Sequence, residues 1–201
     1  MEKMNYVVIA TQNQHKLKEI RDILRDFSIE VKALIDIGLG DLEVVEDGLT
    51  FEENSMKKAM EVMKASGFIA MADDSGLEVD VLDNQPGVYS ARFSGENATD
   101  KKNNDKLLEL LGDRPIEERK ARFVSVISVA FPDGRQLYVR GECPGFIGYE
   151  EHGENGFGYD PLFIVPQYGK TFGELGSDIK NKISHRAVAL EKLKKELIKC
   201  L

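Results

Sequence analysis

The fold of this chain is decided by the stretch Ala70-Met71-Ala72-Asp73-Asp74-Ser75-Gly76-Leu77-Glu78-Val79-Asp80. Residues 68–72 form a short apolar run with the length of a buried strand. We expect this strand to end at Asp73 and Asp74, where Gly76 lets the backbone turn. Two carboxylates at the carboxyl end of a strand suit a hard cation such as Mg²⁺, and one of them can take a proton from water. A solvated turn is the alternative interpretation.

Length and composition predict a single globular domain over residues 1–201. Hydrophobic residues make up 42% of the chain and charged residues 31%, which is ordinary for a globular protein. Because 27 basic residues face 35 acidic ones, the net charge of −8 argues against a surface that binds a nucleic acid polymer. A small anionic substrate in a local basic pocket remains compatible with this charge.

Cysteine usage and hydropathy predict a cytoplasmic protein with no membrane anchor. Cys143 and Cys200 have neither metal-site spacing nor a disulfide framework, which favours a reducing compartment. The N-terminus has no apolar signal-peptide core. The longest strongly apolar stretch, residues 123–131, is far shorter than the ~20 residues that span a bilayer.

A strand, a polar loop and a helix follow one another at the N-terminus. Residues 6–10 are an apolar, β-rich run, and Asn13 is a favourable N-cap for the helix after it. The helix N-terminus, the side chains of Thr11 and Asn13 and the charge of Lys16 predict a phosphate-binding loop without the Gly-rich Walker pattern. An ordinary capped helix with an exposed Lys is the alternative. The helix is expected to bury Leu17, Ile20, Leu24 and Phe27.

An acidic loop, residues 41–48, precedes a second helix. Thr50 as N-cap and Glu53 three positions later form a capping box at the start of that helix. Glu46 is the candidate for a second metal carboxylate, with Glu43 in reserve. The helix is expected to run to about residue 66 and to bury Phe51, Met56, Ala59, Met60 and Met63.

Further strands are predicted at residues 29–35, 77–82, 121–131 and 136–147. The Asp-Gly turn between the last two predicts an antiparallel hairpin, and hence a mixed sheet. A polar helix capped by Thr99 is expected to end at Gly112 and to bury Leu107, Leu108, Leu110 and Leu111. A C-terminal amphipathic helix is expected to open at residues 180–186 and to bury Leu190, Leu193 and Leu197.

A Gly-rich segment, Asn155-Gly156-Phe157-Gly158-Tyr159-Asp160, suggests a place where the backbone approaches a ligand closely. Phe157 could stack on a flat base, which contributes roughly 1–3 kcal/mol. A Gly-rich turn around a core Phe is the alternative. The later cluster Ser184-His185-Arg186 could be a surface cap, because a lone His is more often structural than catalytic.

Together these motifs resemble the inosine/xanthosine triphosphate pyrophosphatase family, whose members remove deaminated purines from the nucleotide pool. The resemblance runs in order from about residue 6 to residue 198. It is carried by Thr11-x-Asn13-x-x-Lys16, residues 72–77, residues 86–92, residues 156–161 and residues 183–186.

The resemblance implies an elongated mixed β-sheet flanked by helices, with two lobes and a substrate cleft between them, and a homodimer. It implies Mg²⁺-dependent hydrolysis of ITP, dITP or XTP to the monophosphate and pyrophosphate. Asp74 is then the base and a metal ligand, with Glu46 as the second ligand. The residues implied for substrate binding are Thr11, Gln12, Asn13, Gln14, His15, Lys16, Ser75, Phe157, Gly158, Tyr159, Asp160, Lys180, His185 and Arg186. Gln12 stands where the family usually has Gly.

Two alternatives remain on the sequence. The chain could be a related pyrophosphatase that acts on pyrimidine or modified nucleotides. It could also be a nucleotide-binding regulatory module without enzymatic activity, but the intact acid pair and the acidic loop argue against this. A haloacid-dehalogenase phosphatase is excluded, because its Asp-x-Asp pattern is absent where Asp73-Asp74-Ser75 stands.

Overall fold

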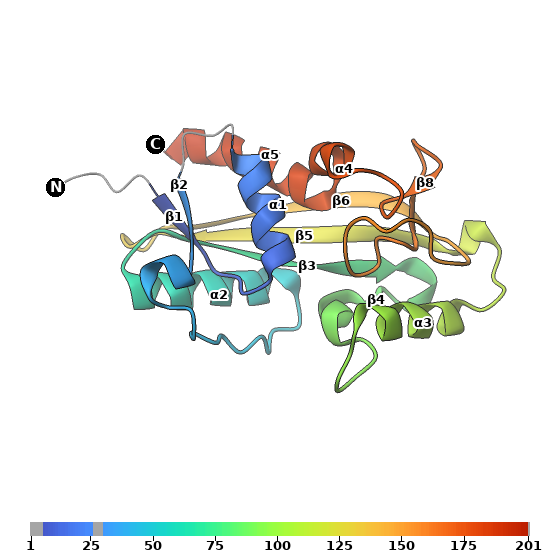
Figure 1. Cartoon of the computed structure of the whole chain (residues 1–201). Helices are drawn as coiled ribbons and strands as arrows, with labels where there is room; N and C mark the ends of the chain where they lie inside the picture. The colour runs from blue at the N-terminus through green and yellow to red at the C-terminus, as the bar shows by residue number, and fades with distance from the viewer. Residues whose placement is uncertain (1–5, 26–29, 201) are drawn as a thin grey trace. The chain divides into compact units, whose positions relative to one another are not determined.

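The computed structural model describes residues 6–25 and 30–200 and shows an α/β protein built on one mixed sheet (Figure 1). The helices and strands are β1 (Tyr6–Ile9), α1 (Gln14–Leu24), β2 (Glu30–Ala33), α2 (Phe51–Ser66), β3 (Ala70–Val79), β4 (Gln85–Pro86), α3 (Asp100–Leu111), β5 (Lys120–Ala130), β6 (Gln136–Ile147), β7 (Phe163–Val165), β8 (Lys170–Thr171), α4 (Ser177–Ile183) and α5 (His185–Cys200). Short 3₁₀ turns cover residues 35–37, 80–82, 87–92 and 116–118.

The strand order of the sheet is β2-β1-β3-β5-β6-β7-β8, with β4 paired to β3. Strand β1 is parallel to both β2 and β3. Strand β4 is antiparallel to β3, and β7 is antiparallel to β6 and β8. The predicted mixed sheet flanked by helices is therefore confirmed.

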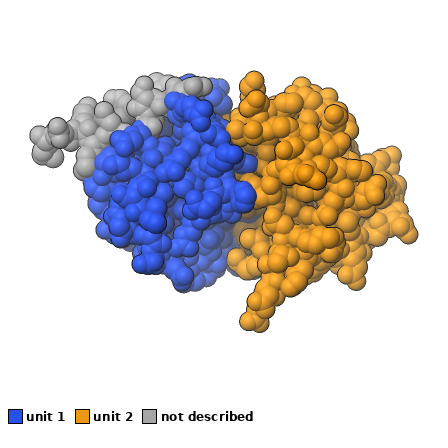
Figure 2. Space-filling view, in the orientation of Figure 1, with its two compact units in different colours: residues 1–74, 125–141, 189–201 blue, residues 75–124, 142–188 orange. Residues whose placement is uncertain are grey.

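The chain divides into two compact units, which Figure 2 shows in different colours. Unit 1 comprises residues 1–74, 125–141 and 189–201, and unit 2 comprises residues 75–124 and 142–188. The long strands β3, β5 and β6 each contribute residues to both units. That both units act as one domain with a cleft stays a prediction.

In unit 1 the sheet is buried on both faces, as the apolar runs of its strands require. Successive strand residues point to opposite faces. Val7, Ile9 and Met71 pack in one cluster with α1 and α5, whereas Val8 and Ala70 pack in another with α2. The same alternation continues along β3 and decides which helix each acidic residue of that strand meets.

Unit 2 has a single apolar core, to which strands and the helices α3 and α4 contribute. Three phenylalanines pack against one another in it: the tilted rings of Phe123 and Phe163 have centroids 4.5 Å apart, and the stacked rings of Phe163 and Phe172 have centroids 5.5 Å apart. Leu77 on β3 and Leu107 on α3 complete this core. The core gives the Gly-rich segment after β6 a rigid support.

The prediction that a strand ends at Asp73 and Asp74 is wrong. Strand β3 continues through both acids and Gly76 to Val79, and a 3₁₀ turn replaces the second strand expected at residues 77–82. The backbone does not turn here, because burial on both sides holds the polar residues in the sheet. Gly76 serves a different purpose: it leaves room for Ser90 and Gly87 to pack against the strand.

The C-terminal amphipathic helix is in fact two helices, α4 and α5, separated at Ser184. Ser184 has extended backbone and its hydroxyl accepts a hydrogen bond from Ala187 N at 3.3 Å, so it begins the second helix. Leu190 and Leu193 are buried in α5, and Leu197 packs partly buried against the same core, as predicted.

Most other predicted boundaries are close to the observed ones. The capping box at Thr50 and the end of α2 are confirmed, and so is the N-cap at Asn13. Leu110 was expected in the core but is 41% exposed, because it lies to one side of the α3 face on which Leu107 and Leu111 pack in the core of unit 2. Phe27, which was expected in the first helix, lies outside the described residues.

The strand expected over residues 29–35 is shorter in the structure, because β2 covers Glu30–Ala33 and a 3₁₀ turn follows it. Ile29 lies outside the described residues.

Within the described ranges, no helix combines the length and apolarity needed to cross a bilayer.

We expect Gly76→Ala to lower the free energy of unfolding by about 1–3 kcal/mol or more. A Cβ at this position would clash with Ser90 Oγ and would lie 2.5 Å from the backbone oxygen of Gly87, which cannot yield easily. Urea denaturation measures the difference. Gly148→Ala is the control, because its Cβ would meet Ile164 Cδ1 at an ordinary 3.4 Å. Equal losses in the two variants would contradict the packing argument.

Candidate functional site

Asp73 and Asp74 follow one another on β3, so their side chains point to opposite faces of the sheet. Asp73 faces α1: its Oδ2 lies 2.9 Å from Lys16 Nζ, and its Oδ1 accepts a hydrogen bond of 2.6 Å from Ser125 Oγ. The Asp73 side chain is fully buried. Asp73 therefore fixes the position of Lys16 and closes one side of the strand.

Asp74 faces α2, where it meets the buried ammonium of Lys58. Lys58 Nζ lies 3.3 Å from Asp74 Oδ1 and 2.9 Å from Glu46 Oε2, and it donates to the backbone oxygen of Asp73 at 3.0 Å. One side chain of α2 thus joins the acidic loop to β3. We call Lys16, Glu46, Lys58, Asp73 and Asp74 the charged cluster; all five belong to unit 1.

Burial and charge act in opposite directions on these groups. Burial raises the pKa of Asp74 above its ordinary value, and Lys58 and Lys16 only partly offset this effect. Partial burial also acts to raise the pKa of Glu46, but the ion pair with Lys58 outweighs it and the net pKa is lowered. Burial acts to lower the pKa of Lys58, but Asp74 and Glu46 raise it to above its ordinary value. Lys58 is therefore a permanent cation.

The donor set of the charged cluster fits a hard divalent cation. Asp74 Oδ2 is buried and has no hydrogen-bond partner among the described residues, although a buried carboxylate oxygen ordinarily has one. The side chain of Glu46 is 37% exposed, so its carboxylate remains accessible. Three carboxylates against two ammonium groups leave one excess negative charge. Oxygen ligands and an excess of negative charge are what Mg²⁺ requires.

The described residues contain no group of three or more His, Cys, Asp and Glu side chains arranged around a metal position. The charged cluster thus offers two candidate protein ligands, Asp74 and Glu46. Such a pair suits Mg²⁺, which is commonly held by one or two carboxylates together with water and substrate phosphates.

Lys58 was missed in the sequence analysis, although a signal for it exists. The buried face of α2 includes Phe51, Lys58, Ala59 and Val62, at helical spacing. A Lys in the middle of such an apolar stripe must find a carboxylate, because burying an unpaired charge is costly. Asn54 and Ser55 lie buried on the same face of α2 and were also missed.

The first loop, residues 11–16, has the predicted capped-helix geometry. Asn13 Oδ1 accepts hydrogen bonds from the backbone nitrogens of His15 and Lys16, at 3.0 and 3.1 Å. Thr11 Oγ1 accepts one from Asn13 N at 3.1 Å. Two backbone donors at the start of α1 are thus already used by the cap, so the charge of Lys16 is the main attraction for an anion.

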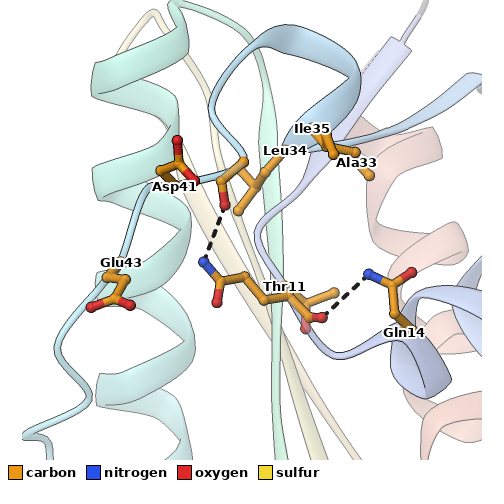
Figure 3. Close-up of a pocket in the computed structure, with 9 residues that line it drawn as sticks. Thr11, Gln14, Ala33, Leu34, Ile35, Asp41 and Glu43 are labelled. Atoms are coloured by element: carbon orange, nitrogen blue, oxygen red, sulfur yellow. Dashed lines mark hydrogen bonds between the residues drawn. The ribbon is translucent and has the colours of Figure 1, made fainter.

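The backbone φ of Gln12 is not positive, since Gln12 is not among the described residues with positive φ. The first loop therefore does not require a Gly at this position. The Gln12 side chain borders a pocket of about 410 Å³ formed by the first loop and the start of the acidic loop. Figure 3 shows Asp41 and Glu43 along one side of this pocket and Thr11 and Gln14 on the first loop. Glu43 thus lines the pocket, whereas Glu46 joins the charged cluster.

In unit 2, Phe157, Asp160 and Lys180 form what we call the aromatic cluster. Lys180 Nζ lies 2.6 Å from Asp160 Oδ2, and both side chains are almost fully buried. The same Oδ2 accepts a hydrogen bond from Phe157 N at 2.8 Å, and Lys180 Nζ lies 4.6 Å from the centroid of the Phe157 ring. Gly156 has a φ of 79°, and a Cβ there would clash with Asp160, so only Gly permits this turn.

The remaining predicted residues of unit 2 are held by its core. Arg186 is fully buried and donates to Ser75 Oγ at 2.9 Å, so it fixes the residue that follows Asp74 in the chain. His185 stacks on Phe123 with the ring centroids 4.9 Å apart. Tyr159 donates to Ser90 O at 2.8 Å, and burial raises its pKa.

Gly158 presents its backbone rather than a side chain. Its nitrogen donates to Asp100 Oδ2 at 2.7 Å, and its oxygen accepts from Asn104 Nδ2 at 3.2 Å. Both contacts come from α3, which was not connected with this segment in the sequence analysis. The Gly-rich segment is therefore held by α3 on one side and by the Asp160–Lys180 pair on the other.

Comparison with known proteins places the chain among relatives that it matches over nearly its whole length. A family model described as the Ham1 family matches residues 7–196. A dITP/XTP pyrophosphatase from Clostridium perfringens is 52% identical over 200 residues, covering 96% of this chain and 98% of the relative. One from Bacillus cereus strain ATCC 14579 is 49% identical over 199 residues, covering 98% and 97%.

Solved structures agree with the sequence comparisons. The Ham1 protein of Staphylococcus aureus has a TM-score of 0.87 and 41% identity, covering 98% of this chain and 100% of that chain. A HAM1 protein from Coxiella burnetii has the same TM-score and 40% identity, with the same coverage. The resemblance stated from the sequence is confirmed.

Lys58→Met is expected to lower the free energy of unfolding by about 3 kcal/mol or more, because it leaves the buried carboxylate of Asp74 without the ammonium that contacts it. Lys57→Met is the matched control. Lys57 is the preceding residue and pairs with the exposed Asp47, so its loss should cost much less than the loss of Lys58. Urea denaturation without added metal compares the two. If both variants lose the same free energy, Lys58 is not the buried counter-ion described here.

Proposed function

Since this chain belongs to the Ham1 family, we propose that it hydrolyses the triphosphates of deaminated purine nucleosides, ITP, dITP and XTP, to the monophosphate and pyrophosphate. The pyrophosphatase names of the relatives support this activity. Such an enzyme keeps deaminated bases out of DNA and RNA. The charged cluster would act on the phosphates and the aromatic cluster on the base.

The observation that carries this proposal is the state of Asp74. Its Oδ2 is buried and lacks a hydrogen-bond partner among the described residues, while Lys58 holds its Oδ1 and joins it to Glu46. Most buried side-chain oxygens in folded proteins have a hydrogen-bond partner, so an oxygen without one is unusual for a purely structural carboxylate. A carboxylate with one oxygen reserved fits a role as metal ligand and base.

Asp74 and Glu46 would hold a magnesium ion, with Lys16 and Lys58 beside them. When bound, the metal would neutralise phosphate charge as a Lewis acid. Lys16 and Lys58 add positive charge for the phosphate chain, and Thr11 and Asn13 border it with polar groups. Hydrolysis of this kind depends mainly on positioning and charge neutralisation, so two fixed ammonium groups are a substantial part of what the protein must supply.

Asp74 orients the attacking water and accepts its proton. The water oxygen forms a bond to phosphorus, the anhydride bond between the α and β phosphates breaks, and its electron pair leaves with the departing phosphate oxygen. In the metal-free protein, burial raises the pKa of Asp74 above its ordinary value, so this carboxylate accepts a proton more readily than an exposed Asp before the metal binds. Arg186 supports this geometry indirectly, because it fixes Ser75.

The base would be recognised in unit 2. Phe157 offers a flat ring for stacking, and Lys180, His185 and Arg186 carry N–H donors that suit the oxygen on C6 of hypoxanthine or xanthine. The amino group on C6 of adenine would present hydrogens to the same donors and leave them unpaired, which is costly in a buried site. Guanine keeps the oxygen on C6, so it is distinguished only at its 2-amino group.

A homodimer and a cytoplasmic location accompany this proposal. The homodimer comes from the resemblance to the family, and the cytoplasmic location from the cysteine usage, which favours a reducing compartment. Sedimentation at micromolar concentration tests the dimer.

Asp74→Asn is expected to reduce kcat by about 10²–10⁴-fold or more, since it removes a base and a metal ligand together. The measurement is pyrophosphate release from ITP with Mg²⁺, with circular dichroism to check the fold. Asp47→Asn, a change at an exposed acid paired with Lys57, should leave kcat unchanged. An Asp74→Asn enzyme with a native spectrum and kcat within tenfold of wild type would disprove the assignment.

We expect kcat/KM for ITP and XTP to exceed that for ATP by up to about 10⁴-fold, with weaker discrimination against GTP. Phe157→Leu should lower kcat/KM for all four nucleotides by a similar factor of about 5–100, because stacking does not distinguish purines. Steady-state kinetics on the four triphosphates gives both ratios. ATP hydrolysed as efficiently as ITP would refute the proposed base recognition.

A further inference from the structure

Gln12 joins the first loop to the segment that carries the acidic loop. Its Nε2 donates to Gly40 O at 3.3 Å and to Leu42 O at 3.2 Å. A side-chain amide has two N–H groups, so both bonds can form at once. Since a backbone carbonyl can only accept, these two partners also fix which end of the amide is the nitrogen.

The acidic loop is held at its other end by α2. Lys58 Nζ contacts Glu46 Oε2 at 2.9 Å, and Gly48 N donates to Asn54 Oδ1 at 2.8 Å. Gln12 and α2 therefore hold the two ends of one segment, and Glu46 lies within it. All of these residues belong to unit 1.

Between the Gln12 contacts and Glu46, the acidic loop has no buried side chain: Glu43 and Val45 are exposed and Val44 is half-buried. Val45, directly before Glu46, is 68% exposed, and Glu43 is exposed on the wall of the pocket of Figure 3. Segments with few buried apolar side chains open at low cost in free energy. The position of Glu46 therefore depends on the contacts at both ends of the acidic loop. At the end formed by Gly40 and Leu42, the contact is made by the side chain of Gln12, which belongs to the first loop.

We propose that Gln12 is a positioning residue for the metal site, because it ties the acidic loop to the first loop and so holds Glu46 close to Lys58 and Asp74. This inference rests on the proposed function, in which Glu46 binds the metal. Without the tie, Glu46 is in place for a smaller fraction of the time. The apparent affinity for the metal then falls by the same fraction.

The test uses Gln12→Met in the full chain, since Met has nearly the shape of Gln but cannot donate a hydrogen bond. The probe is Mn²⁺ alone, whose free concentration is followed by electron paramagnetic resonance. We expect the Kd for Mn²⁺ to rise about tenfold, which corresponds to about 1.4 kcal/mol. Hydrogen exchange of backbone amides in the acidic loop should rise about fivefold, while that of α2 stays unchanged.

Kinetics gives a second readout of metal binding in the same variant. With ITP as substrate, the metal concentration that gives half the maximal rate should rise by the factor seen for the Kd of Mn²⁺. A role confined to stability would shift the unfolding midpoint and leave both metal measurements as in wild type. Unchanged metal measurements in Gln12→Met would overturn the inference.

Gln136→Met is the matched control, because the Gln136 amide also joins two segments of unit 1 but contacts Met60 Sδ, on α2. It should leave the Kd for Mn²⁺ unchanged; a rise equal to that of Gln12→Met would overturn the inference. Glu46→Gln separates the two proposals. If Glu46→Gln weakens Mn²⁺ binding and Gln12→Met does not, the positioning role alone fails. If neither does, the metal site assigned to Glu46 fails first.

Discussion

The ammonium of Lys58, buried among Glu46, Asp74 and the backbone oxygen of Asp73, is the contact on which unit 1 depends. It joins three segments that follow one another in the chain: the acidic loop, α2 and β3. Each carboxylate would be expensive to bury alone, and so would the ammonium. Lys58 holds the buried carboxylate of Asp74 and the more exposed carboxylate of Glu46 at a fixed place, and Asp74 Oδ2 has no hydrogen-bond partner in the part of the chain that the structure describes.

The aromatic cluster in unit 2 follows the same principle with different residues. The buried pair of Asp160 and Lys180 holds a backbone turn, and that turn presents the ring of Phe157. In both units a Lys from a helix neutralises an Asp that the fold has placed. The charges thus position groups as well as bind them, which explains why residues expected to contact substrate also contact one another.

Much of the fold could be predicted from the sequence because its signals are local. The capping box at Thr50, the N-cap at Asn13 and the Asp-Gly turn before β6 depend only on neighbouring residues. The course of β3 could not be predicted, because Asp73 and Asp74 resemble a turn until α1, α2 and β5 supply partners for them. The break at Ser184 was missed for a related reason: the amphipathic pattern continues across it, whereas the backbone does not.

For the candidate site, residue types were easier to predict than contacts. The acids and the Lys of the first loop carry recognisable chemistry, so they were found, but the pairing of Lys16 with Asp73 depends on how α1 lies on the sheet. Lys58 could have been found only by first identifying the apolar face of α2 and then noticing that this face contains a charged residue. Gln12 was named only as part of the first loop, and its contact with the acidic loop gave no signal, since its partners are backbone oxygens about 30 residues away.

The alternation along β3 has a consequence for how this chain can change. Met71 and Asp73 face α1, while Ala70, Ala72 and Asp74 face α2. Which helix each acid meets therefore depends on whether it lies at an odd or an even position along the strand. A single insertion or deletion within β3 would exchange the faces of every residue after it and present the wrong acid to Lys58. A substitution in this strand affects one position and can be compensated by a change in a neighbouring residue. A change in the length of the strand affects every later position at once.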